Sequence, residues 1–131
     1  MIVLDTHAWI WWVGSPDLLS PQARSTIDVA MAEKSLFVSS ISAWEVAMLV
    51  SKGRLQLTLD VRDWIARCEA LPFLTFVPVD NAIAVQATRL VNWVHADPAD
   101  RIIVSTALSL GAEVVSKDEK IRAYPYVKTI W

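Results

Sequence analysis

The stretch His95-Ala-Asp-Pro-Ala-Asp-Arg-Ile-Ile-Val-Ser-Thr-Ala-Leu-Ser-Leu110 has the pattern of a well-capped, buried helix. Asp97 stands where an N-cap carboxylate accepts free backbone N–H groups, and Pro98 takes the first helical position, where its missing N–H costs nothing. Apolar residues then recur at intervals of three and four, and Gly111 ends the pattern. Asp100 is the exception, because it begins a helix whose other side is apolar. It can complement the helix dipole, or it can be held at the rim of a sheet for chemistry.

Short apolar runs alternate with helical patterns along the rest of the chain. Uninterrupted apolar runs, typical of strands covered on both faces, predict strands at residues 2–4, 36–38, 73–79 and 112–115, with an edge strand at 126–130. Periodicity and caps predict helices at residues 7–13, 21–33, 43–52, 61–68, 81–93 and 98–110. The alternation predicts one three-layer α/β domain over residues 1–131, with a central, mostly parallel sheet of four to five strands flanked by helices.

Composition excludes several classes of protein. The chain has 131 residues, 54% of them hydrophobic, which suits one folded domain with a real core. No apolar run approaches the roughly 20 residues of a membrane span, and the N-terminus lacks the basic segment of a signal peptide. The single cysteine, Cys68, excludes an internal disulfide and a cysteine-based zinc site, and it suits the cytoplasm. A net charge of -2 argues against a basic nucleic-acid-binding domain, but not against a nuclease with an acidic site.

Acidic residues lie at the ends of the predicted strands. Asp5 ends the first strand and Glu45 follows the second, whereas Asp97 and Asp100 precede the fourth strand and Asp118 follows it. A parallel sheet gathers these acids at one edge, where ligands of α/β sheets bind. Their mutual repulsion requires either protonation or a cation. Carboxylate oxygens without clustered histidine or cysteine favour Mg²⁺ or Mn²⁺ over Zn²⁺.

Each acid also has a purely structural interpretation. The segment Ser42-Ala-Trp-Glu45 fits a capping box, Asp97 fits a helix cap, and Asp118 lies in a Lys-Asp-Glu-Lys turn. Asp5 is hardest to explain in this way, because only apolar residues precede it and a buried strand ends there. Chance caps are not expected to coincide with the ends of three strands, so the joint pattern favours a shared site.

Four segments carry a resemblance to known proteins: Val-Leu-Asp5-Thr6-His7, Ser42-Ala-Trp44-Glu45-Val-Ala47, His95-Ala-Asp97-Pro98-Ala99-Asp100-Arg101 and Val-Ser116-Lys-Asp118-Glu-Lys-Ile. Together they resemble the PIN-domain ribonucleases, and specifically the VapC-type toxins of bacterial toxin–antitoxin pairs. The resemblance spans nearly the whole chain, and Asp-Pro-Ala-Asp-Arg is its most specific part. Ser105 and Ser116 are small departures, since similar sequences often have Ala and Thr at these positions.

The resemblance implies a metal-dependent endoribonuclease toxin that hydrolyses RNA phosphodiester bonds with Mg²⁺ or Mn²⁺ and is inhibited by a cognate antitoxin. It implies that the catalytic, metal-holding acids are Asp5, Glu45, Asp100 and Asp118. The expected secondary members of the site are Thr6, Asp97, Arg101 and Ser116. A cytoplasmic homodimer, whose two subunits share an RNA groove, is also expected.

Several polar residues near these segments leave alternatives open. Arg101 can pair with the adjacent Asp100, which is favoured slightly, or reach a substrate phosphate. His95 is interpreted as a hydrogen-bonded packing residue rather than a base, since catalytic roles are rare. Four further cations can contact the RNA backbone: Lys52, Arg54, Lys117 and Lys120.

Three tryptophans within four positions mark the first helix. Trp9, Trp11 and Trp12 cannot all point inward from one helix, so at least one is expected to meet solvent or a partner. This helix and the segment Met48-Leu49-Val50 form either a surface for an antitoxin helix or ordinary core plus a dimer contact.

Three other functions compete with this interpretation. The main alternative is a PIN-type nuclease in RNA processing or DNA flap cleavage that has no antitoxin. A receiver-like regulatory domain also clusters acids around Mg²⁺. It requires an acidic pair at the first strand and an aspartate that can be phosphorylated after the third strand. In this chain Thr6 follows Asp5, and Asp80, after the third strand, opens a helix instead. A non-catalytic binding protein whose acids are only caps is the remaining hypothesis.

Overall fold

The computed structural model describes all of residues 1–131 and contains one five-stranded sheet. The strands are β1 (Ile2–Leu4), β2 (Leu36–Ser39), β3 (Leu74–Val77), β4 (Glu113–Val115) and β5 (Thr129–Ile130). Their order across the sheet is β3-β2-β1-β4-β5, and every neighbouring pair is parallel. The predicted α/β class and parallel sheet are therefore confirmed.

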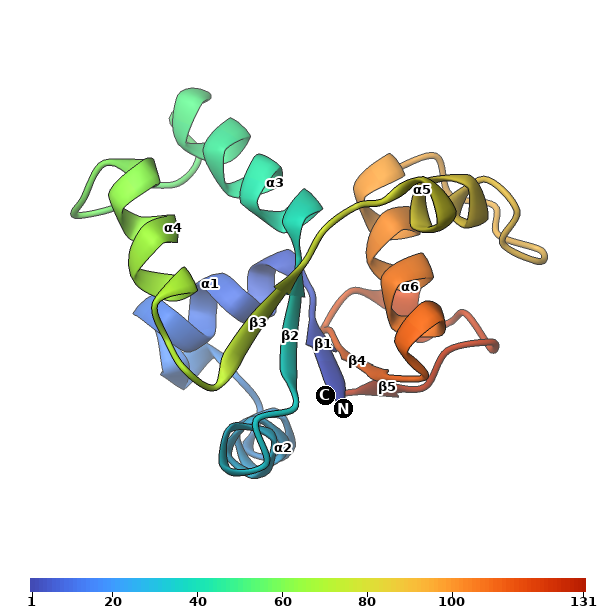
Figure 1. The fold of residues 1–131 in the computed structure, drawn as a ribbon, viewed down its shortest axis with the longest axis horizontal. Helices are drawn as coiled ribbons and strands as arrows, with labels where there is room; N and C mark the ends of the chain where they lie inside the picture. Colours follow the sequence, from blue (N-terminus) through green and yellow to red (C-terminus); the bar gives the residue numbers. More distant parts are fainter.

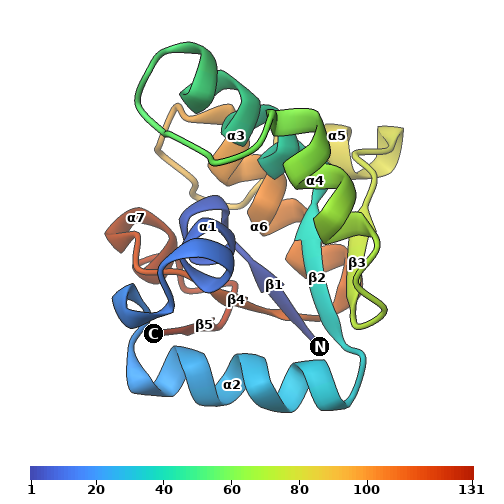
Figure 2. The same cartoon turned by 90° about the vertical axis from the view of Figure 1, so that its left-hand side faces the viewer.

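Helices cover both faces of this sheet. They are α1 (Thr6–Gly14), α2 (Pro21–Ala32), α3 (Ser40–Ser51), α4 (Val61–Glu69), α5 (Asn81–Ala87), α6 (Pro98–Leu110) and α7 (Glu119–Arg122), with a short 3₁₀ helix at Pro16–Leu18. Figure 1 shows α1, α3 and α4 on one side of the strands and α5 and α6 on the other. Figure 2 shows α2 running below the sheet, across the ends where the strands begin. This is the expected three-layer arrangement.

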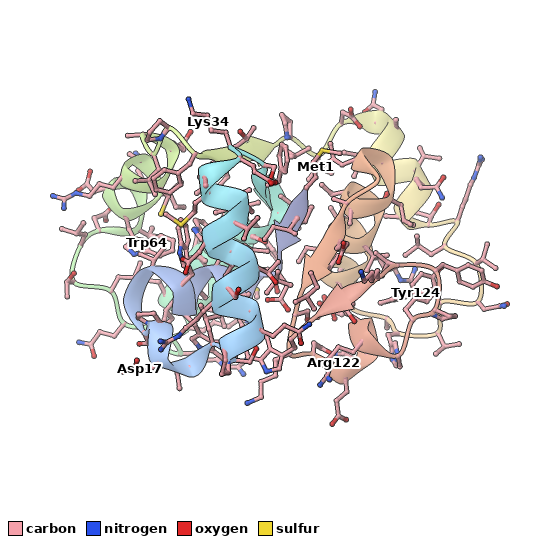
Figure 3. The ribbon with its side chains drawn as sticks, turned by 90° about the horizontal axis from the view of Figure 1, so that it is seen from below. Met1, Asp17, Lys34, Trp64, Arg122 and Tyr124 are labelled. Atoms are coloured by element: carbon pink, nitrogen blue, oxygen red, sulfur yellow. The ribbon has the colours of Figure 1, made fainter.

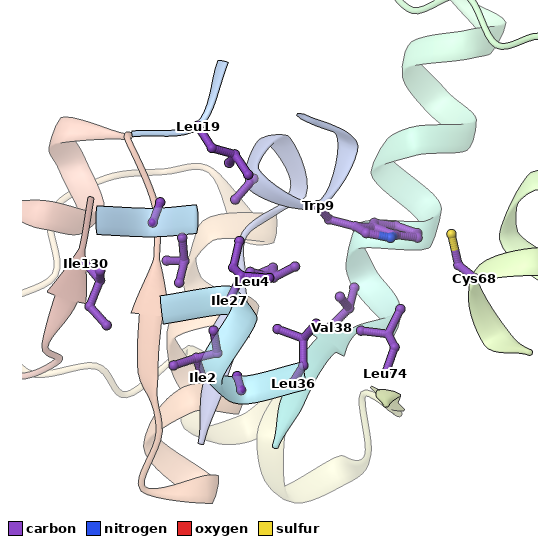
Figure 4. Packing of buried hydrophobic residues seen from close by; sticks show 14 of the residues in the cluster. Ile2, Leu4, Trp9, Leu19, Ile27, Leu36, Val38, Cys68, Leu74 and Ile130 are labelled. Atoms are coloured by element: carbon purple, nitrogen blue, oxygen red, sulfur yellow. The ribbon is translucent and has the colours of Figure 1, made fainter. Parts of the chain in front are cut away.

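The side chains of the central strand alternate between two cores. Ile2 and Leu4 belong to the larger core, whereas Val3 belongs to a second core on the opposite face. In the larger core Trp9 is fully buried, with ring centroids 4.8 Å from Trp64 and 5.4 Å from Phe76. Figure 4 shows the Trp9 indole directed toward α4. The first tryptophan of α1 therefore anchors that helix to the sheet.

The second core rests on α6, the helix with which the sequence analysis began. Ile103, Val104 and Ala107 are buried there against the sheet. The Asp97 side chain accepts the Ala99 N–H at 3.0 Å, and Gly111 ends the helix with a left-handed φ of 65°. The predicted cap and stop of this helix are confirmed.

Every α-helix begins at a side chain that accepts a backbone N–H from its first turn. These caps are Asp5, Ser20, Ser39, Asp60, Asp80, Asp97 and Asp118. Because Asp5, Ser39 and Asp118 lie within three residues of the ends of β1, β2 and β4, the helices after those strands start close to the same edge of the sheet.

Three local predictions are wrong. The helix expected at residue 43 begins at Ser40, because Ser39 rather than Ser42 caps it. The helix expected to reach residue 93 ends at Ala87, and Asn92 adopts a left-handed φ of 56° in the turns that follow. The segment expected to be a plain turn after β4 contains the short helix α7, which Asp118 caps.

Two further observations concern the position of α2 and the character of the helices. Figure 3 shows α2 in front of the strands, with Lys34 just beyond its C-terminal end and Asp17 near its start. No helix combines the length and the apolar character that crossing a bilayer requires.

We expect Trp9→Ala to lower the free energy of unfolding by about 3–5 kcal/mol, because it removes a fully buried indole from the larger core. Trp44→Ala is the matched control, since Trp44 is 55% exposed on α3, and it should cost less than about 0.5 kcal/mol. Urea denaturation of both variants measures the difference. Equal losses would show that Trp9 does not hold α1 on the sheet.

Candidate active site

The register of the central strands brings polar residues to one edge. Leu4 pairs with Val38 of β2 and with Val115 of β4, so the residues that follow these three emerge side by side. The Asp5 N–H donates to the Val115 carbonyl at 3.1 Å, which holds the end of β1 against β4. Asp5, Ser39 and Ser116 consequently share the carboxyl edge of the sheet.

Asp5 is buried at this edge with an exposed fraction of only 6%. Its Oδ1 accepts the Ala8 N–H at 2.8 Å and so caps α1. Burial raises the pKa of Asp5 above its ordinary value, and the charge of Asp118 adds to this increase. The hydroxyl of Ser116 and the charge of His7 oppose it. Asp5 is thus a helix cap and also a member of a charged cluster.

Glu45 reaches the same edge from α3. Thr6 Oγ1, at the start of α1, hydrogen bonds to Glu45 Oε1 and lies 2.9 Å from Ser42 Oγ. Burial raises the pKa of Glu45, the hydrogen bond from Thr6 lowers it, and the charge of Asp97 raises it further. The capping-box interpretation is therefore wrong, because Glu45 bonds across to α1 and Ser42 is a buried link between the two helices.

Asp100 lies at the start of α6 and is only 9% exposed. Burial, followed by repulsion from Asp97 and Asp118, raises the pKa of Asp100 to about 7. Its Oδ2 is buried and accepts no hydrogen bond. The Lys120 Nζ is 3.6 Å from this oxygen and 3.8 Å from Asp118 Oδ2, distances that suit an ion pair but not a good hydrogen bond. The exposed Lys120 ammonium group is therefore the one charged side chain that pairs with this carboxylate.

Asp97 and Asp118 lie around Asp100 as caps. Asp118 accepts the Lys120 N–H at 2.8 Å, and its own N–H donates to Ser116 Oγ at 3.0 Å. Asp97 caps α6 and contributes the largest repulsion that any charge exerts on Asp100. Asp97 and Asp118 therefore act both as helix caps and as negative charges that raise the pKa of Asp100.

The structure gathers the four primary acids of the sequence analysis at this edge. Glu45, Asp97 and Asp118 each affect the pKa of Asp100, and Asp118 also affects that of Asp5. No group of three acidic, histidine or cysteine side chains is arranged so that it could hold a metal ion. Thr6 and Ser116 are the hydroxyl groups that contact the cluster.

Arg101 does not behave as expected. The structure contains no ion pair between Arg101 and Asp100, and the Arg101 Nε donates instead to the carbonyl of His95 at 3.0 Å. The same carbonyl accepts the Trp93 Nε1 at 2.8 Å, and the His95 ring packs edge-on to Trp93 at 5.5 Å. Arg101 therefore fixes the loop before α6, and the packing interpretation of His95 agrees with these contacts.

Two contacts of the site escaped the sequence analysis. The local pattern predicts a helix cap at Ser42, whereas its contact with Thr6 joins residues 36 positions apart, which no local pattern indicates. The sequence indicates only an RNA contact for Lys120. Its position is a consequence of α7, whose cap at Asp118 turns the following residues back toward α6.

Comparisons with known proteins agree with this architecture. The family model for the PIN domain matches residues 2–125. Ribonuclease VapC22 from Mycobacterium tuberculosis is 33% identical over 132 residues, which cover 99% of this chain and 98% of that protein.

Three solved structures share the fold. VapBC2 from Rickettsia felis, bound to a DNA fragment from its promoter, has a TM-score of 0.72 at 16% identity and covers 98% of this chain and 97% of its own. FitAcB from Neisseria gonorrhoeae has a TM-score of 0.67 at 21% identity, with 98% and 96% covered. A toxin–antitoxin complex from Klebsiella pneumoniae has a TM-score of 0.63 at 18% identity, with 97% and 95% covered. From the family match and the full-length similarity to a VapC ribonuclease, the chain belongs to the PIN-domain family.

Proposed function

We propose that this protein is a metal-dependent endoribonuclease toxin that hydrolyses RNA phosphodiester bonds in the cytoplasm and is inhibited by a cognate antitoxin. The observation that carries the proposal is the Asp100 carboxylate, which is buried among acids with an oxygen that accepts no hydrogen bond. Perturbed carboxylates of this kind cluster at functional sites. The full-length relative named a ribonuclease supports RNA hydrolysis, and the toxin–antitoxin complex of similar fold supports an antitoxin.

The acidic edge fits a hard divalent cation. All of its charged donors are carboxylate oxygens, the ligands that Mg²⁺ and Mn²⁺ prefer. No three of these side chains are arranged to hold an ion by themselves, so water would have to complete the coordination, as it usually does around Mg²⁺. The residues that would hold it, directly or through water, are Asp5, Glu45, Asp100 and Asp118.

A bound divalent ion supplies a water of lowered pKa and neutralises the charge that develops on the phosphate. The protein's own residues orient the acids. Thr6 holds Glu45 through its hydroxyl, and Ser116 holds Asp5 and the backbone of Asp118. Neither histidine ring hydrogen bonds to a hydroxyl group, so no serine–histidine pair offers a protein nucleophile as an alternative route.

The substrate and the assembly are proposed on the same basis. Lys52, Arg54 and Lys117 are exposed and can contact the RNA backbone. A homodimer would join two such surfaces into one groove and offset the low basicity of each chain, whose net charge is -2. A nuclease that works without an antitoxin is less favoured, because complexes of toxin and antitoxin share this fold over nearly the whole chain.

We expect purified protein to cleave RNA only with Mg²⁺ or Mn²⁺, and Asp5→Asn and Asp100→Asn to lose more than about 100-fold in kcat, because direct metal ligands matter more than their outer-shell partners. Cleavage of labelled RNA, with and without EDTA, measures this. Asp97→Asn is the matched control, since it removes the same charge while asparagine still caps α6. It should lose less activity than Asp100→Asn. A larger loss in Asp97→Asn would reverse the two roles, and activity that survives EDTA would refute the metal site.

The stability of the metal-free protein should fall as pH rises. The folded-state pKa of Asp100, about 7, lies above its ordinary value of 3.8, so the folded protein binds the proton more tightly. That stabilisation is complete below the ordinary pKa and is lost as pH rises through about 7. The pKa values of Asp5 and Glu45 are also raised and act in the same direction.

Between about pH 5 and pH 8, we expect wild type in EDTA to lose about 1–2 kcal/mol more than Asp100→Asn, a magnitude reduced for solvent screening at the sheet edge. Urea denaturation across this pH range measures the difference. Parallel pH profiles for the two proteins would contradict the assignment of this titration to Asp100.

Expression of the wild-type protein in a bacterium should arrest growth, and Asp100→Asn should relieve the arrest while accumulating to the same level. Growth curves and immunoblots measure both quantities. A protein that cleaves RNA in vitro but does not slow growth would favour the nuclease without an antitoxin. A short open reading frame directly upstream, encoding a DNA-binding pattern at its start, would instead support the toxin.

A further inference from the structure

A cavity of about 370 Å³ adjoins the acidic edge. It is lined by Asp5, His7, Trp11, Lys117 and Asp118. Its volume falls within the range of about 300–1,000 Å³ that is typical of small-ligand sites. Asp5 and Asp118 belong to the proposed metal site, so a ligand in the cavity would lie beside the reacting phosphate. His7 and Trp11 have no role in the proposed hydrolysis, and Lys117 enters it only as a contact to the RNA backbone.

Trp11 forms the aromatic wall of this cavity. The three tryptophans of α1 differ in their surroundings: Trp9 is fully buried, and Trp12 packs at 6.0 Å against Phe73. Trp11 is only partly buried, and its ring centroid lies 5.7 Å from those of His7 and Trp131. Trp11 and Trp12 are both partly buried against the larger core, but only Trp11 also lines the cavity.

The charges around the cavity select the kind of ligand. The Lys117 Nζ lies 5.9 Å from the Trp11 ring centroid, at the far limit of a cation–π contact, and the lysine is exposed. The carboxylates of Asp5 and Asp118 also line the cavity and repel an anion, whereas an uncharged aromatic group meets no such penalty. A nucleobase combines a neutral aromatic ring with a flanking phosphate, and the cavity offers a partner for each.

We propose that Trp11 stacks an unpaired nucleobase of the RNA next to the scissile phosphate, while Lys117 pairs with a neighbouring phosphate. This inference rests on the proposed function and adds to it that the substrate presents a single-stranded nucleotide at the cleaved bond. Stacking on an aromatic side chain tolerates every base, since each base has a π face. The subsite therefore recognises strandedness rather than a particular sequence.

The test uses an unstructured RNA in which the cleaved bond has been mapped. A series of substrates then carries one abasic nucleotide at each position around that bond. With wild type, one flanking abasic position should lower kcat/KM by about 5- to 100-fold. Trp11→Ala should show the same loss on intact RNA, mainly through KM, and no further loss on the abasic substrate. Trp11→Phe should recover part of the difference.

Trp12→Ala is the matched control. It removes another partly buried tryptophan from the same helix but does not line the cavity, so it should keep the wild-type sensitivity to the abasic nucleotide. Melting temperatures of all variants separate a loss of folding from a loss of stacking. If Trp11→Ala does not fold, Trp11→Phe takes its place in the test. Because the Phe ring has a smaller area, an abasic nucleotide should lower kcat/KM less in Trp11→Phe than in wild type.

Two results would overturn the subsite and leave the nuclease function intact. One is equal sensitivity of wild type and Trp11→Ala to every abasic position. The other is unchanged cleavage by Trp11→Ala combined with weaker inhibition by the antitoxin, which would assign the cavity to a protein side chain. If wild type does not cleave RNA, the proposed function fails and binding decides the subsite. The affinity of the Asp100→Asn protein for intact and for abasic RNA would then be compared with and without Trp11. Tighter binding of intact RNA that is lost in Trp11→Ala would support the subsite, and equal affinities for the two RNAs would overturn it.

Discussion

Parallel pairing of β1 with both of its neighbours is the constraint on which the rest of the molecule depends. The strand has only three residues, all buried, and they alternate between the two cores. Because all strands point the same way, the helices that follow β1, β2 and β4 start near one edge, where their caps meet. A slip of one residue in the register would exchange the two faces of β1 and move Asp5 away from Ser116.

The acidic edge is costly for the folded protein. Burial and mutual repulsion raise the pKa values of Asp5, Glu45 and Asp100, and only part of this is offset by hydroxyl groups and by Lys120. Asp5 and Asp118 reduce the cost by capping helices with the same carboxylates that form the cluster. The same aspartate thus satisfies free backbone N–H groups and contributes charge to the site, which explains why Asp97 and Asp118 allowed two interpretations.

Local patterns predicted what depends on local physics. The strands, the parallel sheet, the cap at Asp97 and the gathering of acids all follow from apolar runs and capping preferences. The partner of Glu45 could not be predicted in this way, since Thr6 lies 39 residues away and a capping-box pattern in the sequence pointed to Ser42 instead. The family resemblance, rather than the residues alone, indicated RNA as the substrate.

The end of the chain has a practical consequence for handling the protein. The strand β5 is parallel to the others, so Trp131 emerges at the carboxyl edge of the sheet, with its ring 5.7 Å from that of Trp11. Met1 precedes β1, and Figure 2 shows the two ends of the chain well apart. An affinity tag or fusion partner attached after Trp131 would start beside the cavity, whereas one attached before Met1 would start at the opposite end of the strands. Amino-terminal tagging is therefore the choice that leaves the acidic edge open.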